Sequence, residues 1–264
     1  QIIKDAVTKV EVKIRPELAN SISNYTTEAR TAINLLLDAY SLALYENEVR
    51  TSKKSNKGSK INISEDILYQ ALNNRRMTLN HKVEISSSKE TGSIFGLGVN
   101  GYCGKIIEIE AIAFKAGQKG KGKLRFNETA GSMAQDSLFN ATSVVRKLTG
   151  SNIDDFDLHV NIVGGANIDG PSAGLALLLA IISAIKEIPL PQNIAVTGEV
   201  SIQGKVKPVG GLREKIGAAE QAGIEKVLIP AGNKNDFRKA KGIEIVSVTN
   251  VREALEVVLE GQYI

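Results

Sequence analysis

The feature that most restricts the fold is an apolar run from Ala173 to Ile185, which only Ser183 interrupts. The run is shorter than the about 20 residues that a membrane-spanning helix needs. We therefore predict a helix buried in the core of a globular domain. Apolar residues make up 42% of the chain, which is enough to build such a core.

The predicted helix begins with a motif, Asp-Gly-Pro-Ser-Ala-Gly, at residues 169–174. Pro171 suits the first helical position, where its missing N–H would be unpaired in any case. Ser172 is then expected in the first turn, where backbone N–H groups have no partner within the helix. These donors and the positive end of the helix dipole would stabilise an oxyanion. A hydroxyl beside such a site is half of an acyl-transfer enzyme.

The other half should be a base. Residues 170–174 match the G-x-S-x-G elbow of hydrolases, in which an acid and then a histidine follow the serine. Here His81 and His159 both precede Ser172, so that order cannot be completed. The positions of the two histidines leave open a chymotrypsin-like order, in which the histidine precedes the serine. That order would need an all-β double barrel, and the long apolar helix argues against such a fold. The two histidines are also too far apart to suggest a metal site, and we expect none.

Lysine is the remaining common base. One face of a predicted helix carries Leu212, Lys215, Ile216, Ala219 and Ala222, and the other carries Arg213, Glu220 and Gln221. Lys215 is thus the one charge on an apolar stripe. Burial there would lower its pKa, so that the neutral amine could accept the Ser172 proton. The alternative is a structural lysine that extends to solvent, as we expect of Lys205 and Lys207 in a strand and turn.

Three motifs in this order and spacing resemble the proteolytic domain of the Lon protease family, and a B-type Lon fits. They are DGPSAG (169–174), VTGE (196–199) and GGLREK (210–215), within a similarity that covers about residues 90–264. The resemblance implies a catalytic Ser172–Lys215 dyad with Thr197 near the lysine. It implies Asp169, Gly170 and Ala173 as supporting residues. The chain departs from many members at Asn167-Ile168, where they carry Pro-Lys.

The N-terminal part of the chain is predicted to be helical. Thr26 or Thr27 can cap a long helix that ends near Glu46, and Ser64 can cap a second helix. Between them, residues 50–60 are basic and polar, which indicates a mobile loop. Contact with nucleic acid or an acidic partner is the alternative for this loop.

The stretches YTTEARTAINLL (25–36) and INISEDILYQAL (61–72) resemble the helical lid of an AAA+ ATPase. This resemblance implies that Arg30 is a nucleotide sensor; the alternative is an ordinary surface arginine. The ATPase core itself is not found. Residues 117–124 miss the P-loop pattern, because Leu124 stands where a hydroxyl must meet magnesium. A G-x-G-x-x-G match at residues 96–101 leads into a strand, so we interpret it as a hairpin and not as a dinucleotide site.

From residue 93 onward, strands and helices alternate, and we predict a mixed α/β (α+β) fold. The resemblance implies the Lon proteolytic domain, of the fold type that it shares with RNA-binding ribosomal domains. The predicted organisation is a helical AAA+ lid-like subdomain at 1–80, a connector at 81–92 and the proteolytic domain at 93–264. Strands are predicted at 106–114, 123–126, 157–163, 194–197, 226–229 and 243–248, and helices at 133–148 and 251–259.

The resemblance implies an ATP-dependent serine endopeptidase that degrades unfolded or regulatory proteins. The full-length protein is then expected to be a hexamer that uses ATP and magnesium, with no cofactor in this chain. No signal peptide is visible in the sequence. Because the chain begins at Gln1 without Met, we expect a fragment. Its single cysteine, Cys103, cannot form an intrachain disulfide, which favours a reducing compartment. The resemblance implies a cytoplasmic location.

Two other hypotheses stay open. The domain could be a non-catalytic binding module that contacts nucleic acid through residues 50–60 and 115–125, although a net charge of +4 does not imply this by itself. The fragment could also be folded but inactive, because ring assembly completes the site. No membrane partner is expected.

Overall fold

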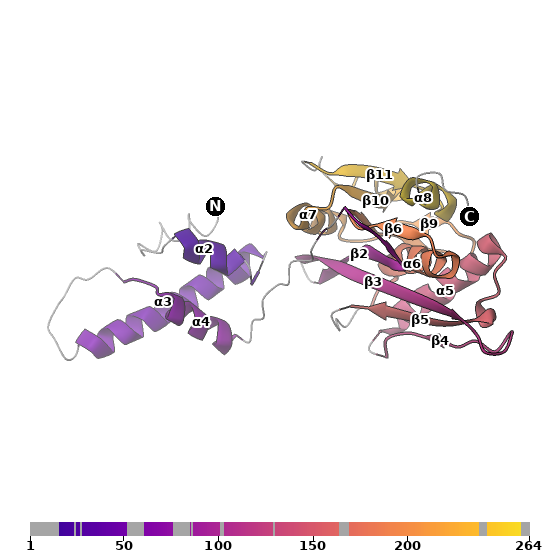
Figure 1. Ribbon diagram of the computed structural model, residues 1–264. Coiled ribbons are helices and arrows are strands. Elements are labelled where there is room, and N and C mark those ends of the chain that lie inside the picture. The colour runs from indigo at the N-terminus through magenta and orange to yellow at the C-terminus, as the bar shows by residue number, and fades with distance from the viewer. Residues whose placement is uncertain are drawn as a thin grey trace. The chain divides into compact units, whose positions relative to one another are not determined.

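The computed structural model describes residues 16–23, 25–26, 28–51, 61–75, 85, 87–100, 103–128, 130–163, 169–237 and 242–259. The chain divides into two compact units, residues 1–82 and 83–264, and each is described by itself (Figure 1). Residues 52–60, His81 and Asn167-Ile168, which entered the predictions above, lie outside the described residues.

Three helices form the described part of the first unit: α2 (Pro16–Ser23), α3 (Ala29–Thr51) and α4 (Glu65–Asn74). They bury one apolar cluster, to which each helix contributes. Its fully buried members include Leu18, Ile22, Leu35, Leu36, Ala39, Leu68, Ala71 and Leu72. This shared core keeps α2 and α4 in place, which at 8 and 10 residues would be marginal in isolation.

Helix α3 begins as predicted but extends further. The Thr26 hydroxyl accepts the N–H of Glu28 at 3.1 Å, just before the helix. The prediction that it ends near Glu46 is wrong, since α3 continues to Thr51 and includes the first two residues of the predicted loop. The physical reason is that residues 46–51 contain neither Gly nor Pro, so nothing in the backbone stops the helix there.

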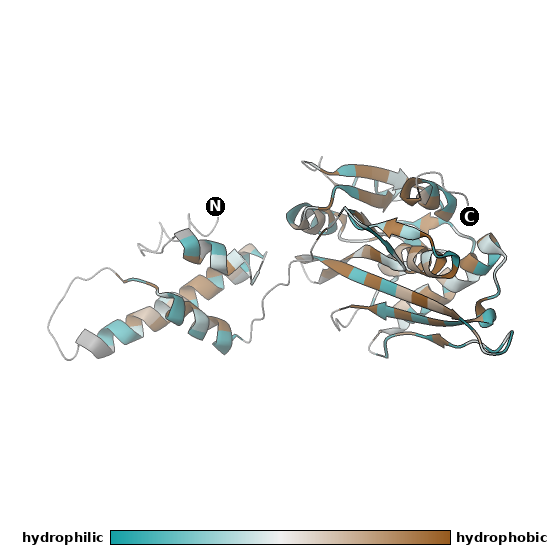
Figure 2. Ribbon diagram, viewed as in Figure 1, coloured by the Kyte–Doolittle hydropathy of each residue, from teal (hydrophilic) through white to brown (hydrophobic). Residues whose placement is uncertain are grey.

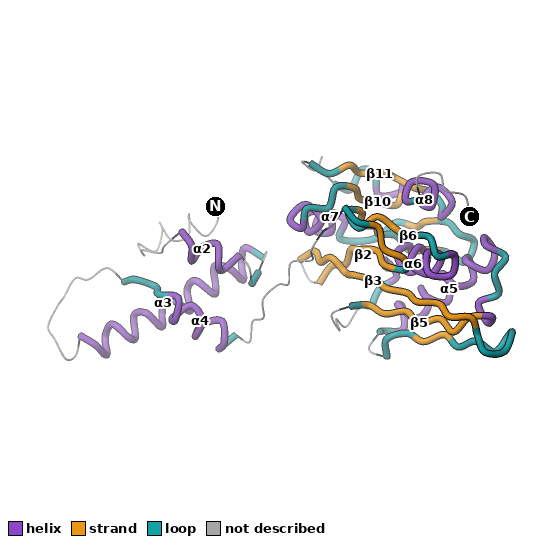
Figure 3. The backbone as a smooth tube through the Cα atoms, viewed as in Figure 1, coloured by secondary structure: helices purple, strands orange, loops and turns teal. Residues whose placement is uncertain are grey.

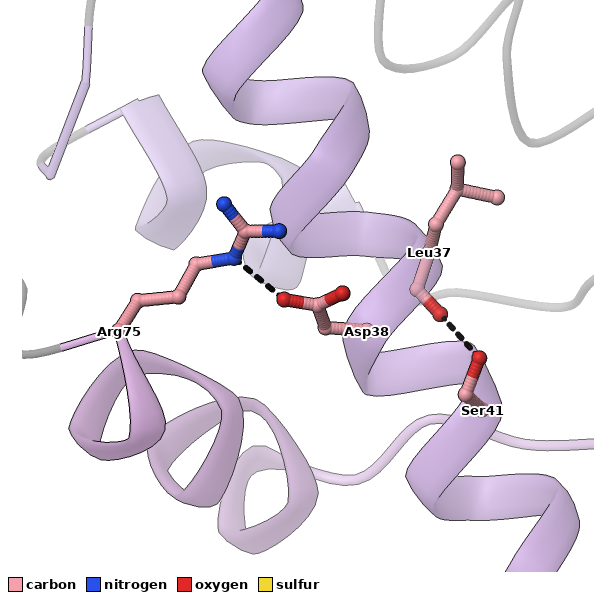
Figure 4. A network of polar contacts seen from close by, with 4 residues as sticks. All are labelled: Leu37, Asp38, Ser41 and Arg75. Carbon is pink, nitrogen blue, oxygen red and sulfur yellow. Dashed lines mark hydrogen bonds and ion pairs between the residues drawn. The ribbon is translucent and has the colours of Figure 1, made fainter.

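An exposed contact joins the end of α4 to the middle of α3. The Arg75 Nε group donates to the Asp38 carboxylate, and one turn along α3 the Ser41 hydroxyl donates to the Leu37 carbonyl at 2.9 Å (Figure 4). Because both charged side chains are partly exposed to water, this ion pair adds little to stability compared with the apolar cluster.

The cap of α4 has the predicted form. Ser64 precedes the helix in an extended conformation, and its hydroxyl accepts the N–H of Ile67 at 3.3 Å. We expect Ser64→Ala to lower the free energy of unfolding of this unit by about 1 kcal/mol, because one helical N–H loses its acceptor. Chemical denaturation followed by circular dichroism measures this loss. Ser41→Ala, on the exposed face of α3, is the matched control, and an equal loss there would contradict a capping role.

The second unit is built on a seven-stranded mixed sheet (Figure 3). Its order is β11 (Glu244–Val248), β10 (Lys226–Pro230), β7 (Ile194–Val196), β2 (Ser93–Asn100), β3 (Cys103–Lys115), β5 (Phe156–Ile162) and β4 (Leu124–Arg125). Strands β2 and β3 form an antiparallel hairpin, and β3 pairs antiparallel with β5. The pairs β11–β10, β10–β7, β7–β2 and β5–β4 are parallel. The prediction of a mixed α/β fold is confirmed.

Successive residues of the sheet point to opposite faces, and each face has its own core. Ile94 belongs to a large cluster with helices α5 (Ser132–Thr149), α6 (Gly174–Lys186) and α8 (Val251–Val258). Its neighbour Phe95 belongs to a smaller cluster with helix α7 (Leu212–Ala222). The apolar alternation of β2 thus divides the helices between the two faces.

Helix α6 is the buried helix that the apolar run predicts. Eleven of its 13 residues are buried, and it is largely brown in the hydropathy view (Figure 2). Its one buried polar residue, Ser183, donates to the Ile188 carbonyl and accepts the N–H of Gly92, so its hydroxyl is satisfied. Among the described residues, no helix is both long and apolar enough to cross a bilayer.

Candidate active site

Ser172 lies in a short 3-10 turn, Pro171–Ala173, and α6 begins only at Gly174. The prediction that Ser172 occupies the first turn of the α-helix is therefore wrong. The cause is tertiary. The N–H of Leu175, which a longer helix would use internally, donates to the Gly198 carbonyl at 3.0 Å, and the Gly198 N–H donates to the Ser172 carbonyl at 3.0 Å.

These two bonds attach the serine turn to the segment that contains Thr197. Gly174 permits the close approach, because a Cβ there would lie 3.0 Å from the backbone nitrogen of Val200. The Thr197 hydroxyl lies 3.5 Å from the carbonyl oxygen of Ser172 and is itself fully buried. The first and second of the three motifs are therefore in direct contact.

Lys215 comes from the other side of the sheet, on α7. It is the largest fully buried side chain of the described residues, with 1% exposure, and its Nζ donates to the Thr197 hydroxyl at 3.2 Å. Burial lowers the pKa of this amine from 10.5 to about 8. At neutral pH a measurable fraction of the amine is therefore uncharged and able to accept a proton.

The rest of α7 follows the predicted division of faces. Leu212, Ile216 and Ala219 are buried beside Lys215, whereas Arg213, Glu220 and Gln221 are exposed. Ala222 is only half-buried, at the helix end that Gly223 terminates with a left-handed conformation. Lys215 is only 1% exposed, which confirms the prediction that its side chain extends inward and not to solvent.

A glycine outside the three motifs brings β3 against α7. A Cβ on Gly104 would lie 1.9 Å from the carbonyl oxygen of Glu214, next to Lys215. Only glycine therefore lets the strand approach the helix this closely. The role of Gly104 is not predicted from the sequence. A single glycine in a strand indicates that another part of the backbone approaches closely, but it does not indicate which part.

Thr197 thus links the two groups: its hydroxyl accepts from the Lys215 amine and contacts the Ser172 backbone. Among the residues that the structure describes, no hydrogen bond joins the Ser172 hydroxyl itself to that amine. Ser172 is half-buried, whereas Ala173 is buried, so the serine side lies at the boundary with solvent. The arrangement places a half-buried alcohol near a buried amine of lowered pKa, which is the set of groups that acyl transfer requires.

The supporting residues have different environments. The Asp169 carboxylate accepts the N–H of Met133 at 3.1 Å and so caps α5, whose preceding residue, Gly131, has no side chain to do so. A Cβ on Gly131 would lie 2.4 Å from the Asp169 oxygen, so glycine is needed there. Gly170 is extended. No local sequence pattern predicts that Asp169 connects the serine segment to α5, because Asp169 and Met133 lie 36 positions apart.

Within the part of the chain that the structure describes, the other candidates take no part in these hydrogen bonds, and each is described in its own unit. Arg30 is exposed near the start of α3 in the first unit. Cys103 is half-buried at the start of β3. His159 is exposed on β5, where its ring meets that of Phe114 edge-on with centroids 6.2 Å apart. Lys205 and Lys207 are exposed, as expected.

The basic segment 115–125 includes the turn between β3 and β4. Its lysines are exposed, and acidic residues nearby support its backbone: Asp155 accepts the N–H of Gly120 and Asp157 that of Lys123, each at 2.9 Å. These carboxylates lie among the lysines and reduce the local positive charge, which weakens the nucleic-acid interpretation of this segment.

Comparison with known proteins agrees with the geometry. A family model described as the C-terminal proteolytic domain of Lon protease matches residues 62–261, so the match begins earlier than the predicted domain. The chain is similar to Lon protease 2 of Bacillus subtilis, with 35% identity over 98% of this chain and 47% of that protein. It is 38% identical to an archaeal Lon protease of Pyrococcus abyssi over 64% of this chain and 18% of that protein. It is 37% identical to a Lon protease of Rickettsia conorii over 65% of this chain and 23% of that protein. The chain spans less than half the length of these relatives.

Proposed function

Because this chain belongs to the Lon protease family, we propose that it is the serine endopeptidase part of a longer, ATP-dependent protease. The observation that carries the proposal is the buried Lys215 amine, bonded to a threonine that also contacts the Ser172 turn. A fully buried lysine without a carboxylate partner costs stability, and such groups are concentrated at functional sites.

In the proposed mechanism the Ser172 hydroxyl attacks the scissile carbonyl, and the neutral Lys215 amine takes its proton. The lysine then protonates the leaving amine, and a water molecule hydrolyses the acyl-enzyme. Thr197 orients the lysine through its hydroxyl. Backbone N–H groups in the segment from Gly170 to Ala173 stabilise the oxyanion.

A rearrangement is proposed to complete the dyad. Ser172 and Lys215 share Thr197 as a neighbour but have no direct hydrogen bond, and catalytic hydrogen bonds often tighten only when substrate is bound. We propose that a shift of the turn Pro171–Ala173 brings the hydroxyl to the amine. In the longer protein, ring assembly or substrate binding would supply this shift, so the isolated chain is expected to be a slow enzyme.

The remaining assignments concern the longer protein. The relatives are more than twice as long as this chain, and we propose that the missing part contains the ATPase that uses ATP and magnesium. The first unit is then the ATPase lid, with Arg30 as its nucleotide sensor, residues 81–92 the connector, and residues 93–264 the proteolytic domain. Hexamer assembly, unfolded or regulatory protein substrates and a cytoplasmic location are proposed on the same basis.

The direct test is covalent labelling. A serine-directed phosphonylating probe is expected to modify Ser172 in the 264-residue chain, as mapped by mass spectrometry of peptides. Labelling that spares Ser172 would contradict the proposal. Salt-sensitive binding of nucleic acid without any labelling would favour the non-catalytic binding module instead.

The labelling rate should depend on pH through Lys215. Only the neutral amine accepts a proton, so the rate is expected to rise with pH and level off above a pKa of about 8. Two units below that pKa the rate should be lower by about 100-fold, since each unit reduces the neutral fraction tenfold. The rate is measured at each pH by stopping the labelling reaction at several times and quantifying modified Ser172. A rate that is flat from acidic to alkaline pH would contradict Lys215 as the base.

A further inference from the structure

The loop that leads into α7 determines where Lys215 lies. It runs between β9 (Val206–Lys207) and Leu212 and contains two consecutive glycines, Gly210 and Gly211. The first α-helical hydrogen bond of α7 runs from the Lys215 N–H to the Gly211 carbonyl at 3.0 Å. A displacement of Gly211 therefore displaces Lys215 directly. Glycine pairs are flexible, so something else must keep this loop in place.

One buried side chain does so. Asn233 ends the 3-10 turn Ala231–Asn233 and is only 3% exposed. Its Oδ1 accepts the N–H of Val209 at 2.8 Å, and its Nδ2 donates to the carbonyl of the same residue at 3.0 Å. The amide thus pairs with both backbone groups of Val209, as a neighbouring strand would.

The second hydrogen of the Asn233 amide is also used. The Nδ2 group donates to the Asp236 carboxylate at 2.6 Å. This charge-assisted bond fixes the orientation of the amide plane, because a flipped amide would turn its oxygen toward the carboxylate. The side chain therefore has one orientation in which all of its observed contacts are made.

Apolar contacts complete the support on both sides of Val209. The Pro208 ring packs onto Gly232, where a Cβ would lie 2.5 Å from its Cγ atom. Gly211 has a left-handed φ of 65° and packs against Val99, whose Cγ1 would lie 3.0 Å from a Cβ at that position. The backbone on each side of Val209 is thus confined. Among the described residues, Asn233 is the only side chain that forms hydrogen bonds with Val209 itself.

We propose that Asn233 is a positioning residue for the catalytic base: by pairing with Val209 it fixes the start of α7 and so keeps the Lys215 amine at Thr197. The proposal rests on the proposed function of Lys215 but concerns a different residue, from a segment 24 residues further along the chain than Val209. Among the described residues, no hydrogen bond joins Asn233 to the Lys215 amine or to Ser172. Its effect on chemistry would therefore act through Lys215.

The test compares Asn233→Ala with Asn193→Ala. Asn193 also donates its side-chain amide to a carboxylate, that of Glu225 at 2.8 Å, but at the far end of β7. We expect Asn233→Ala to slow labelling of Ser172 by about 10-fold or more, because small misplacements of catalytic groups are costly, whereas Asn193→Ala should leave the rate unchanged. For peptide cleavage the loss should lie in kcat and not in KM, since Asn233 is buried and its side chain bonds to Val209 and Asp236.

A second readout separates positioning from a purely structural role. The Lys215 amine can be titrated by NMR of chains that carry ¹³C-labelled lysine, with Lys215→Arg identifying its signal. In Asn233→Ala the midpoint should move from about 8 toward 10.5, because a loosened α7 exposes the amine to water. Asp236→Ala, which removes only one of the three bonds, keeps the experiment informative if Asn233→Ala does not fold, and its shift should be smaller and in the same direction.

The outcomes are distinguishable. If Ser172 of the unsubstituted chain is not labelled, the proposed function fails, yet the titration still decides whether Asn233 positions Lys215. If labelling occurs but the folded Asn233→Ala chain keeps the parental rate and the parental titration midpoint, the positioning role is overturned while the dyad stands. Equal losses in Asn193→Ala and Asn233→Ala would also overturn it.

Discussion

Ser172→Ala and Lys215→Met are each expected to lower peptide cleavage by the chain by on the order of 10⁴-fold or more, because members of one catalytic unit are not redundant. Ser172→Ala removes the nucleophile. Lys215→Met keeps the volume and the apolar surroundings of a side chain that is 1% exposed but removes the proton acceptor. The rate of hydrolysis of a fluorogenic peptide measures both losses.

The matched control is Lys207→Met, which makes the same substitution at an exposed lysine of the same domain. It should keep the parental rate. Thr197→Val should have an intermediate effect, since it removes the acceptor of the Lys215 amine but neither reacting group. Full activity in Ser172→Ala or Lys215→Met would contradict the dyad, even if Ser172 were labelled in the parent chain.

Lys215→Met should also make the protein more stable, by up to about 3 kcal/mol at pH 7, since a pKa lowered from 10.5 to about 8 corresponds to that cost of burying the charged amine. The loss of the bond to Thr197 will reduce the gain somewhat. Denaturant unfolding of the parent and variant at the same pH measures the difference. A simultaneous loss of activity and gain of stability distinguishes a functional buried lysine from a structural one.

The sign of the pH dependence follows from proton counting. Between pH 8 and 10.5 the unfolded chain keeps the Lys215 proton and the folded chain does not, so the stability of the parent rises with pH in this window. Below about pH 8 the penalty is fully present. The stability advantage of Lys215→Met should therefore be constant below pH 8 and shrink as pH rises toward 10.5. An advantage that grew with pH would contradict a lowered pKa.

The elements themselves could largely be predicted from the sequence, because they depend on residues close along the chain. The run in α6 is apolar at every position but one, and it is buried on all sides. The stripe on α7 follows helical spacing and identifies Lys215 as the charge that points inward. Ser64 caps α4 because an extended serine before a helix can reach its free N–H groups. The predicted end of α3 near Glu46 is wrong, because a basic and polar composition does not by itself end a helix.

The candidate site was only partly accessible in this way. Its residue types and motifs could be recognised, and the inward direction of Lys215 followed from the helical pattern. The exact start of α6 could not be predicted, because a carbonyl of Gly198, far along the chain, takes the N–H that would have extended the helix to Ser172. The cap from Asp169 to α5 is likewise a bond between residues 36 positions apart.

By itself, then, the sequence determined the mixed succession of strands and helices, the buried helix and the amine that faces the core, since periodicity and local capping act within a few residues. Only the tertiary structure decided that Thr197 lies between Lys215 and the Ser172 turn, and that Asn233 holds the loop before α7. These contacts join segments 18 to 25 residues apart in sequence. A hydrogen bond of this kind depends on how the strands pair and how the helices pack, and no local pattern of residues contains that information.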